Sequence, residues 1–219
     1  MNSEDKRNSV RNDYDLIAQQ YSDDYGSYIE DLDIYEEFEN HLSEGARIVD
    51  LGCGSGRTYA YFHKKGYEYV GLDFSEKMKE RAFDIHGEFP YIVDDIVNMK
   101  SHFDDESVDA VFAVYSLFHL PKEDFEKAIA DVNKILRKGG VFLFSYQLGS
   151  GEVFTDEPYL GKEGQKVLYM NYMERPYVDE LLSRNGFEKV YESSKHESGD
   201  GVIGEDGNDA VYVIAKKLQ

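Results

Sequence analysis

Three glycines at alternate positions follow an apolar run near residue 50 and give the first indication of a ligand site. The run Ile48-Val49-Asp50-Leu51 leads directly into Gly52, Gly54 and Gly56. Glycine lets the backbone turn sharply and approach a ligand where a Cβ would clash. A doubly wound α/β protein that binds an adenosine-containing ligand needs such a turn after its first strand. Asp50 can accept hydrogen bonds from a cationic ligand, whereas it would repel a pyrophosphate.

Arg57 separates two interpretations of this turn. The dinucleotide fingerprint G-x-G-x-x-G, started at Gly52, requires a glycine at position 57. The pattern present is instead D-x-G-x-G-x-G, which resembles the first motif of the class I S-adenosylmethionine-dependent methyltransferases. That resemblance covers roughly residues 10–219, with the best motif support between 46 and 146. It implies S-adenosyl-L-methionine as the cofactor and S-adenosyl-L-homocysteine as the product.

A second acidic residue, Asp73, ends the next apolar run, Tyr69-Val70-Gly71-Leu72. A carboxylate at the end of a buried strand can accept both hydroxyls of a ribose, and the resemblance implies the same role. Phe74 would then lie against the adenine face. The alternative is that Asp73 only caps the following helix. Ser75 is the predicted N-cap of that helix, which runs through Met78, and we include both residues in the cofactor site.

A third apolar segment, 90–93, leads into Asp94, Asp95 and Ile96. In the family, an acid at this corner often meets the adenine amino group, and the backbone of the next residue lies at the ring edge. Asp95 and Ile96 fit these roles by position, and Asp94 is an alternative for the acid. These acids can also be read as solvated loop residues with no ligand.

The remaining apolar runs complete the predicted fold. Two further strands are expected at 108–114 and 141–146, separated by a helix over 125–136, and a last helix over 177–185 precedes two final strands. We therefore predict a Rossmann-like doubly wound α/β fold. Its seven-stranded sheet is mostly parallel, with an antiparallel last strand and helices on both faces.

The segment after the fourth predicted strand carries the candidate catalytic residue. Tyr115 and Ser116 follow the strand directly and are expected to shape the methionine end of the cofactor pocket. His119 is the best candidate for a general base, because the carboxyl end of this strand faces the reacting centre and imidazole titrates near neutral pH. A purely structural role for this histidine is the alternative.

Two aromatic-rich segments are predicted to cover the site. Residues 14–25 resemble the "YD-x-IA-x-x-Y" start of many small-molecule methyltransferases, so Tyr14 and Tyr21 are expected in a lid over the cofactor, with residues 1–12 as a polar, disordered lead. The long segment 147–176 is expected to form a substrate cap. Packing alone would also explain these aromatic residues. The candidate acceptor-pocket residues are Tyr25, Tyr146, Tyr169, Tyr172 and Met173.

Composition restricts the compartment and the partners. The 24 basic against 44 acidic residues give a formal charge of −20, which disfavours nucleic-acid binding. No apolar run approaches the ~20 residues of a membrane span, and the start lacks the pattern of a secretory signal. The single cysteine, Cys53, provides no disulfide and no cysteine-based metal site. We expect a cytoplasmic protein with no metal and no membrane partner.

The motifs that are missing point to a small-molecule acceptor. The loop Tyr115-Ser116-Leu117-Phe118 matches neither the Asn/Asp-Pro-Pro-Tyr/Phe motif of nucleic-acid amino methyltransferases nor the paired glutamates of arginine methyltransferases.

We predict one domain: a lid at 1–40, a cofactor core at 46–146, the cap at 147–176, and a final helix and hairpin at 177–219. The alternatives are a non-catalytic binder of S-adenosyl ligands and, disfavoured by Asp50 and Arg57, a nicotinamide-dependent oxidoreductase.

Overall fold

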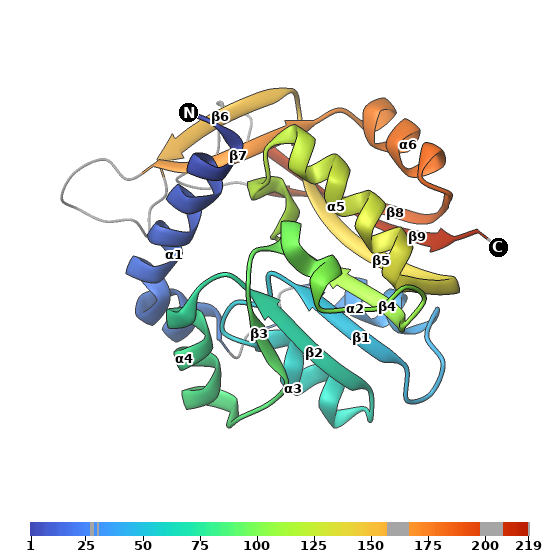
Figure 1. The fold of residues 1–219 in the computed structure, drawn as a ribbon, viewed down its shortest axis with the longest axis horizontal. Coiled ribbons are helices and arrows are strands. Elements are labelled where there is room, and N and C mark those ends of the chain that lie inside the picture. Colours follow the sequence, from blue (N-terminus) through green and yellow to red (C-terminus); the bar gives the residue numbers. More distant parts are fainter. Residues whose placement is uncertain (27–28, 30, 157–166, 198–207, 219) are drawn as a thin grey trace.

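A mixed nine-stranded sheet forms the centre of the molecule (Figure 1). The computed structural model describes residues 1–26, 29, 31–156, 167–197 and 208–218. Within these residues the strands are β1 (Arg47–Leu51), β2 (Glu68–Asp73), β3 (Tyr91–Val93), β4 (Val108–Ala113), β5 (Leu136–Leu148), β6 (Gly151–Asp156), β7 (Val167–Met173), β8 (Phe187–Glu197) and β9 (Asn208–Lys217).

The strand order is β3-β2-β1-β4-β5-β7-β6, and β9 pairs with both β5 and β8. The first five strands are mutually parallel, with Asp50 of β1 opposite Gly71 of β2 and Phe112 of β4. β9 runs antiparallel to β5. The predicted Rossmann-like fold is confirmed. Parallel pairing brings the carboxyl ends of β1, β2, β3 and β4 to one edge of the sheet, where ligands bind in open α/β folds.

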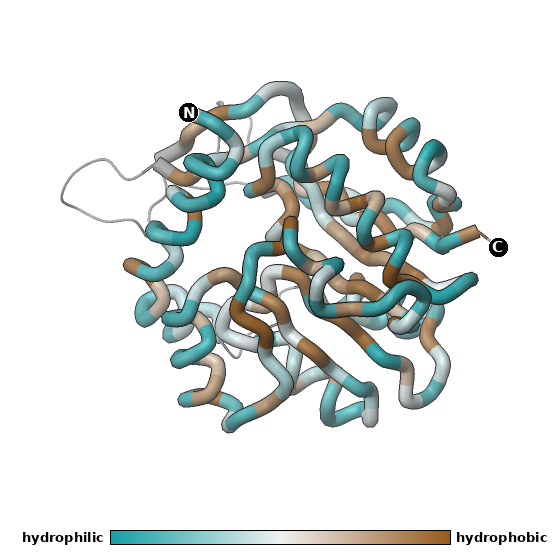
Figure 2. Tube along the Cα trace, viewed as in Figure 1, coloured by the Kyte–Doolittle hydropathy of each residue, from teal (hydrophilic) through white to brown (hydrophobic). Residues whose placement is uncertain are grey.

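Helices cover both faces of the sheet (Figure 1). They are α1 (Ser3–Tyr25), α2 (Leu32–Glu39), α3 (Arg57–Lys64), α4 (Glu76–His86), α5 (Lys122–Ile135) and α6 (Arg175–Arg184), with short 3₁₀ helices η1 (Ile96–Ser101) and η2 (Leu117–His119). Along β5, Phe142 and Phe144 pack with α5 and α6 while Leu143 packs with α2 and α3. Successive side chains of a strand point to opposite faces of the sheet, so β5 is buried on both faces. The apolar residues concentrate along the strands, and the outer helix faces are hydrophilic (Figure 2).

The N-terminal residues are helical, so the prediction of a disordered lead over 1–12 was wrong. Asn2 caps α1: its side chain accepts a hydrogen bond from the Asp5 N–H, and the Asp5 side chain accepts one from the Asn2 N–H. This reciprocal cap satisfies donors that would otherwise be left free at the helix end. Val10 is buried against Leu168 and Tyr169 of β7. The helix therefore lies across the sheet edge, between the β6–β7 pair and α4 (Figure 1).

The predicted cap contributes two strands, which explains why the sheet has nine strands rather than the seven expected. β6 and β7 pair antiparallel, and Gln147 and Leu148 at the end of β5 pair with Tyr172 and Met173 of β7. Residues 157–166, in the middle of the predicted cap, lie outside the described residues. In the described parts of the chain, no helix has the length and apolar character needed to cross a membrane.

Candidate active site

A cavity that is partly open to solvent lies between α1 and the carboxyl ends of the parallel strands. Most of the predicted cofactor residues line it. Those brought together here are Tyr14, Tyr21, Gly52, Gly54, Asp73, Phe74, Met78, Asp95, Ile96, Tyr115, Ser116 and His119, and Arg7 and Leu120 complete the wall.

The glycine turn after β1 has the backbone conformation that its sequence predicts. Gly52 has a φ of 79°, and a Cβ built on it would lie 2.3 Å from the Ser116 Cβ. Any side chain at this position would therefore clash with the loop after β4. Gly54 has a φ of 51°, and its N–H donates to Asp73 Oδ2 at 3.0 Å. Left-handed φ values of this kind favour glycine.

Asp73 ends β2 with its carboxylate buried at the cavity wall. The side chain is 6% exposed, and its Oδ1 accepts the Ser75 N–H at 2.9 Å. Burial raises the pKa of Asp73 to about 6, although the N–H groups of Ser75 and Gly54 act in the opposite direction. Ser75 is the N-cap of α4, since its Oγ accepts the Met78 N–H at 3.0 Å. Ser75 and not Asp73 is therefore the cap of α4, so the capping alternative does not explain the acid at position 73. Each carboxylate oxygen of Asp73 can still accept a further hydrogen bond from a ligand.

Asp50 lines a second, smaller cavity, which shares Gly52 and Gly54 with the first. Its Oδ2 accepts hydrogen bonds from the hydroxyls of Thr58 and, at 2.6 Å, Tyr69. Burial raises the pKa of Asp50 to about 6, against the effect of these two hydroxyls. Two hydroxyl donors thus fix the carboxylate, which lines the smaller cavity and not the larger one.

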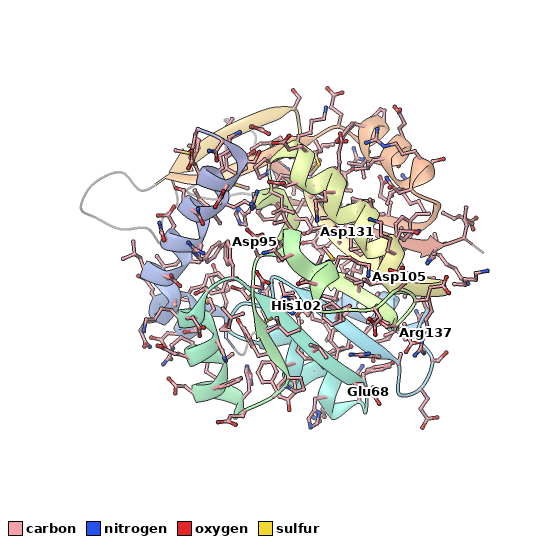
Figure 3. The ribbon with its side chains drawn as sticks, viewed as in Figure 1. Glu68, Asp95, His102, Asp105, Asp131 and Arg137 are labelled. Atoms are coloured by element: carbon pink, nitrogen blue, oxygen red, sulfur yellow. The ribbon has the colours of Figure 1, made fainter. Side chains whose placement is uncertain are left out.

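Asp95 lies after β3 on the side that faces α1 (Figure 3). Arg7 of α1 donates from Nε to Asp95 Oδ2 at 2.7 Å and from a terminal nitrogen to Asp124. These ion pairs hold the start of α1 over the cavity. Asp94, the alternative predicted acid, is not part of the cavity wall. It accepts hydrogen bonds from Asn98 at 2.8 Å and pairs with His102 Nε2 at 2.7 Å.

His119 connects α1 to the strand beneath it. Its Nδ1 lies 2.9 Å from the Tyr169 carbonyl oxygen, and its Nε2 lies 3.0 Å from the Tyr14 hydroxyl. A carbonyl can only accept, so Nδ1 carries the proton and Nε2 accepts from Tyr14. Burial lowers the pKa of His119 to about 4, with the Tyr169 carbonyl acting weakly in the opposite direction. The imidazole is therefore neutral at physiological pH.

The residues directly after β4 are held in an unusual conformation. Tyr115 has a φ of 60°, which is rare for a residue with a side chain, and its N–H donates to Ser145 Oγ at 2.7 Å. Ser116 is 7% exposed, lines the cavity, and its Oγ has no hydrogen-bond partner among the described residues. A buried hydroxyl without a partner is costly, so this atom is suited to a ligand group.

None of the predicted acceptor-pocket residues lines the larger cavity. Tyr146 and Met173 lie in the main core with residues of α5 and α6. Tyr172 packs with Phe118 and Met170 beside Tyr115, and Tyr169 packs under α1. The ring of Tyr25 is tilted against the ring of Tyr21, and the two ring centroids are 5.2 Å apart.

The sequence analysis did not identify Arg7, because a lone arginine in a polar stretch carries no local signal. The cap pattern Asn2-Ser3-Glu4-Asp5 was available and predicts that the helix starts before Arg7. Among the described residues there is no group of three histidine, cysteine or carboxylate side chains placed to hold a metal ion.

This fold resembles that of S-adenosylmethionine-dependent methyltransferases. Residues 49–144 match the family model for a methyltransferase domain. The sterol 24-C-methyltransferase of Debaryomyces hansenii is 28% identical over an alignment of 188 residues, and the match covers 77% of this chain and 47% of that protein. The chain spans about half the length of the sterol methyltransferases that it matches.

Solved structures extend the likeness to the whole fold. The 1,6-didemethyltoxoflavin-N1-methyltransferase of Burkholderia thailandensis, determined with bound S-adenosylhomocysteine, has a TM-score of 0.71 with 16% identity, and the match covers 100% of this chain and 92% of that one. The [4+2]-cyclase SpnF has a TM-score of 0.70 with 15% identity, and 95% of each chain is covered. Identities this low show the fold alone, so the reaction must be argued from the site.

Proposed function

We propose that this protein transfers the methyl group of S-adenosylmethionine to a small-molecule acceptor. One observation carries the proposal: Asp73 and Asp95, from the ends of neighbouring strands, line one cavity together with the glycine turn at Gly52 and Gly54. An adenosine has hydroxyl and amino donors for two acids and a face for an aromatic ring. The methyltransferase-domain match supports the same conclusion.

Each wall of the cavity has a role in this proposal. The Asp73 carboxylate accepts the ribose hydroxyls, because its bonds to Gly54 and Ser75 fix its direction without using all its lone pairs. Phe74 and Ile96 contact the adenine, and Asp95 accepts from its amino group. The unpartnered Ser116 Oγ and the neighbouring Tyr115 also line the cavity, and the methionine part would extend toward them.

Catalysis would depend mainly on positioning. S-adenosylmethionine supplies a methyl group already activated on a sulfonium, so the chain needs no covalent intermediate. Tyr14 and Tyr21, whose rings lie edge to face with centroids 5.9 Å apart, cover the cavity from α1 and exclude water. Aromatic faces also attract a cation. Holding the acceptor in line and close to the methyl group is the larger contribution to the rate.

The Tyr14–His119 pair is the group placed to manage a proton. His119 with a pKa near 4 is a weak base, which favours a positioning role over direct proton removal. In this role His119 fixes the Tyr14 hydroxyl toward the cavity through Nε2. Direct base catalysis by His119 stays a prediction.

The acceptor would reach the site beside Phe118, Met170 and Tyr172, an apolar aromatic cluster next to Tyr115. The apolar character of this buried cluster would favour an acceptor with an apolar body. Relatives are named as acting on a sterol and on phosphoethanolamine, which differ in charge and in size, so both belong in an acceptor screen. A cytoplasmic location and the absence of a nucleic-acid partner stay predictions.

The test is methyl transfer from S-adenosylmethionine carrying a labelled methyl group, with sterols, phosphoethanolamine and a panel of small phenols, amines and acids. Transfer to one acceptor, lost in Asp73→Asn and retained in the surface variant Asp105→Asn, supports the proposal. Asp105 is exposed and pairs with Lys100 far from the cavity. Binding of S-adenosylhomocysteine without transfer to any acceptor would favour the non-catalytic binder instead.

A further inference from the structure

Tyr115 belongs to the wall of both cavities. It lines the larger one together with Ser116 and His119, and the smaller one together with Asp50. The residue is half-buried and lies just beyond the carboxyl end of β4, at the sheet edge where ligands bind in folds of this kind. A change in the direction of this one ring would therefore alter the shape of both cavities.

The backbone of Tyr115 does not fix the ring by itself. A φ of 60° is unfavourable for an aromatic residue, and the bond from its N–H to Ser145 Oγ at 2.7 Å holds the main chain in that conformation. Strain of this kind persists only where the surrounding structure imposes it. The side chain can still rotate about its own bonds, so the direction of the ring depends on contacts at its outer end.

Asp31 provides the contact at the outer end of the ring. The Tyr115 hydroxyl donates to Asp31 Oδ2 at 2.8 Å. A tyrosine hydroxyl has one hydrogen, so in the contact between the Tyr115 and Tyr212 hydroxyls it is Tyr212 that donates. The other oxygen of Asp31, Oδ1, accepts from Lys195 Nζ at 2.8 Å. Both oxygens of the carboxylate are thus engaged, and its direction is fixed by β8 as well as by the ring.

Capping of α2 does not explain the burial of Asp31. Aspartate is a preferred N-cap residue, and Asp31 stands at the N-cap of α2, yet its side chain makes no capping hydrogen bond. The residue is 3% exposed, and a buried carboxylate is unfavourable unless it is paired and hydrogen-bonded. Lys195 and Tyr115 meet this requirement. The carboxylate therefore serves the ring and not the helix.

We propose that Asp31 is a positioning residue of the methyl-transfer site, which holds the Tyr115 ring where the two cavities meet. The inference rests on the proposed function, in which the methionine part of the S-adenosyl compound extends toward Tyr115. The residues that hold the ring come from distant parts of the chain and line neither cavity, so they act through Tyr115: Asp31, Ser145, Lys195 and Tyr212.

The first arm of the test compares two nucleosides by isothermal titration. S-adenosylhomocysteine carries the amino-acid part that would reach Tyr115, and 5′-deoxy-5′-methylthioadenosine lacks it. Asp31→Leu should weaken S-adenosylhomocysteine about three- to tenfold and leave methylthioadenosine within about twofold. Asp31→Asn should recover most of the loss, because its carbonyl oxygen can still accept from the Tyr115 hydroxyl.

Asp131→Leu is the matched control. Asp131 is similarly buried, pairs with Lys127 and Lys134 within α5, and lines neither cavity. Both leucine variants should melt below the natural protein, since each leaves a lysine without its partner, but only Asp31→Leu should change the ratio of the two affinities. An equal change of that ratio in Asp131→Leu would overturn the role of Asp31.

The second arm asks whether Asp31 acts through the Tyr115 hydroxyl. Tyr115→Phe removes the hydroxyl and keeps the ring, so it should weaken S-adenosylhomocysteine by about the same factor, and Asp31→Leu added to it should cost no further affinity. Asp31 also acts electrostatically on Arg57. If that charge were the cause, Asp31→Asn and Asp31→Leu would lose equal affinity and the loss would persist in Tyr115→Phe, which would overturn the proposal.

The outcomes separate this role from the proposed function. If S-adenosylhomocysteine binds equally to the natural protein, Asp31→Leu and Tyr115→Phe, the role of Asp31 is overturned while the proposed function stands. If Asp31→Leu does not fold, Tyr115→Phe decides alone, because it removes the same hydrogen bond from the other side. If S-adenosylhomocysteine does not bind the natural protein, the proposed function fails and the role of Asp31 fails with it.

Discussion

The affinity for S-adenosylhomocysteine should fall as the pH drops through the pKa of Asp73. Burial places that pKa at about 6 in the ligand-free protein. Ribose hydroxyls donate to the ionised carboxylate and so lower its pKa in the complex. Binding then releases a proton below pH 6, and the ionised fraction of the free protein falls from about ten elevenths at pH 7 to about one eleventh at pH 5. The dissociation constant should rise about tenfold over this range.

The assay is isothermal titration of S-adenosylhomocysteine at pH steps from 5 to 8, in buffers of different ionisation enthalpy so that the released proton is counted. Asp73→Asn should bind about 10- to 100-fold more weakly at pH 7, and its affinity should no longer depend on pH. Asp50→Asn is the matched control, because Asp50 has a similar pKa but does not line the larger cavity. A slope that disappears in Asp50→Asn and persists in Asp73→Asn would refute the reasoning.

Three further outcomes can be measured. Gly52→Ala should abolish S-adenosylhomocysteine binding in titration, because its Cβ meets Ser116, whereas Gly45→Ala, equally left-handed but with open space around it, should retain binding. Arg7→Met should cost about 1–3 kcal/mol in chemical denaturation and speed ligand release in stopped-flow traces, because two carboxylates lose their shared cation. The raised pKa of Asp50 stabilises the fold below about pH 4, and this contribution is lost as the pH rises through about 6. Asp50→Asn should therefore melt higher than the natural protein at pH 8, and an unchanged difference between pH 4 and 8 would contradict this.

The parallel core and its acids could be predicted from the sequence because their signals are local. Each buried strand is a short apolar run, and the residue that ends it lies at the ligand edge of the sheet by the geometry of parallel pairing. The positions of Asp73 and Ser75, at the end of β2 and the start of α4, follow from this rule. The positive φ at Gly52 and Gly54 follows from the alternating glycines in the same way.

The parts that could not be predicted depend on contacts between distant segments. Arg7 finds Asp95 and Asp124 only when α1 crosses the sheet edge, and neither acid has a pattern that marks it as a partner. Tyr169 and Met173 of β7 looked alike in the sequence, and they share one face of the strand because they are an even number of residues apart. They differ in what packs against that face, since Tyr169 contacts Val10 of α1 and Met173 lies in the main core.

Titration of the natural protein with S-adenosylhomocysteine and with NADH tests the central claim most directly. Our account predicts binding of S-adenosylhomocysteine at one site per chain and no binding of NADH, because Asp50 and the turn at Gly52 and Gly54 leave no place for a pyrophosphate. Binding of NADH without S-adenosylhomocysteine would contradict the assignment of this cavity and return the protein to the oxidoreductases.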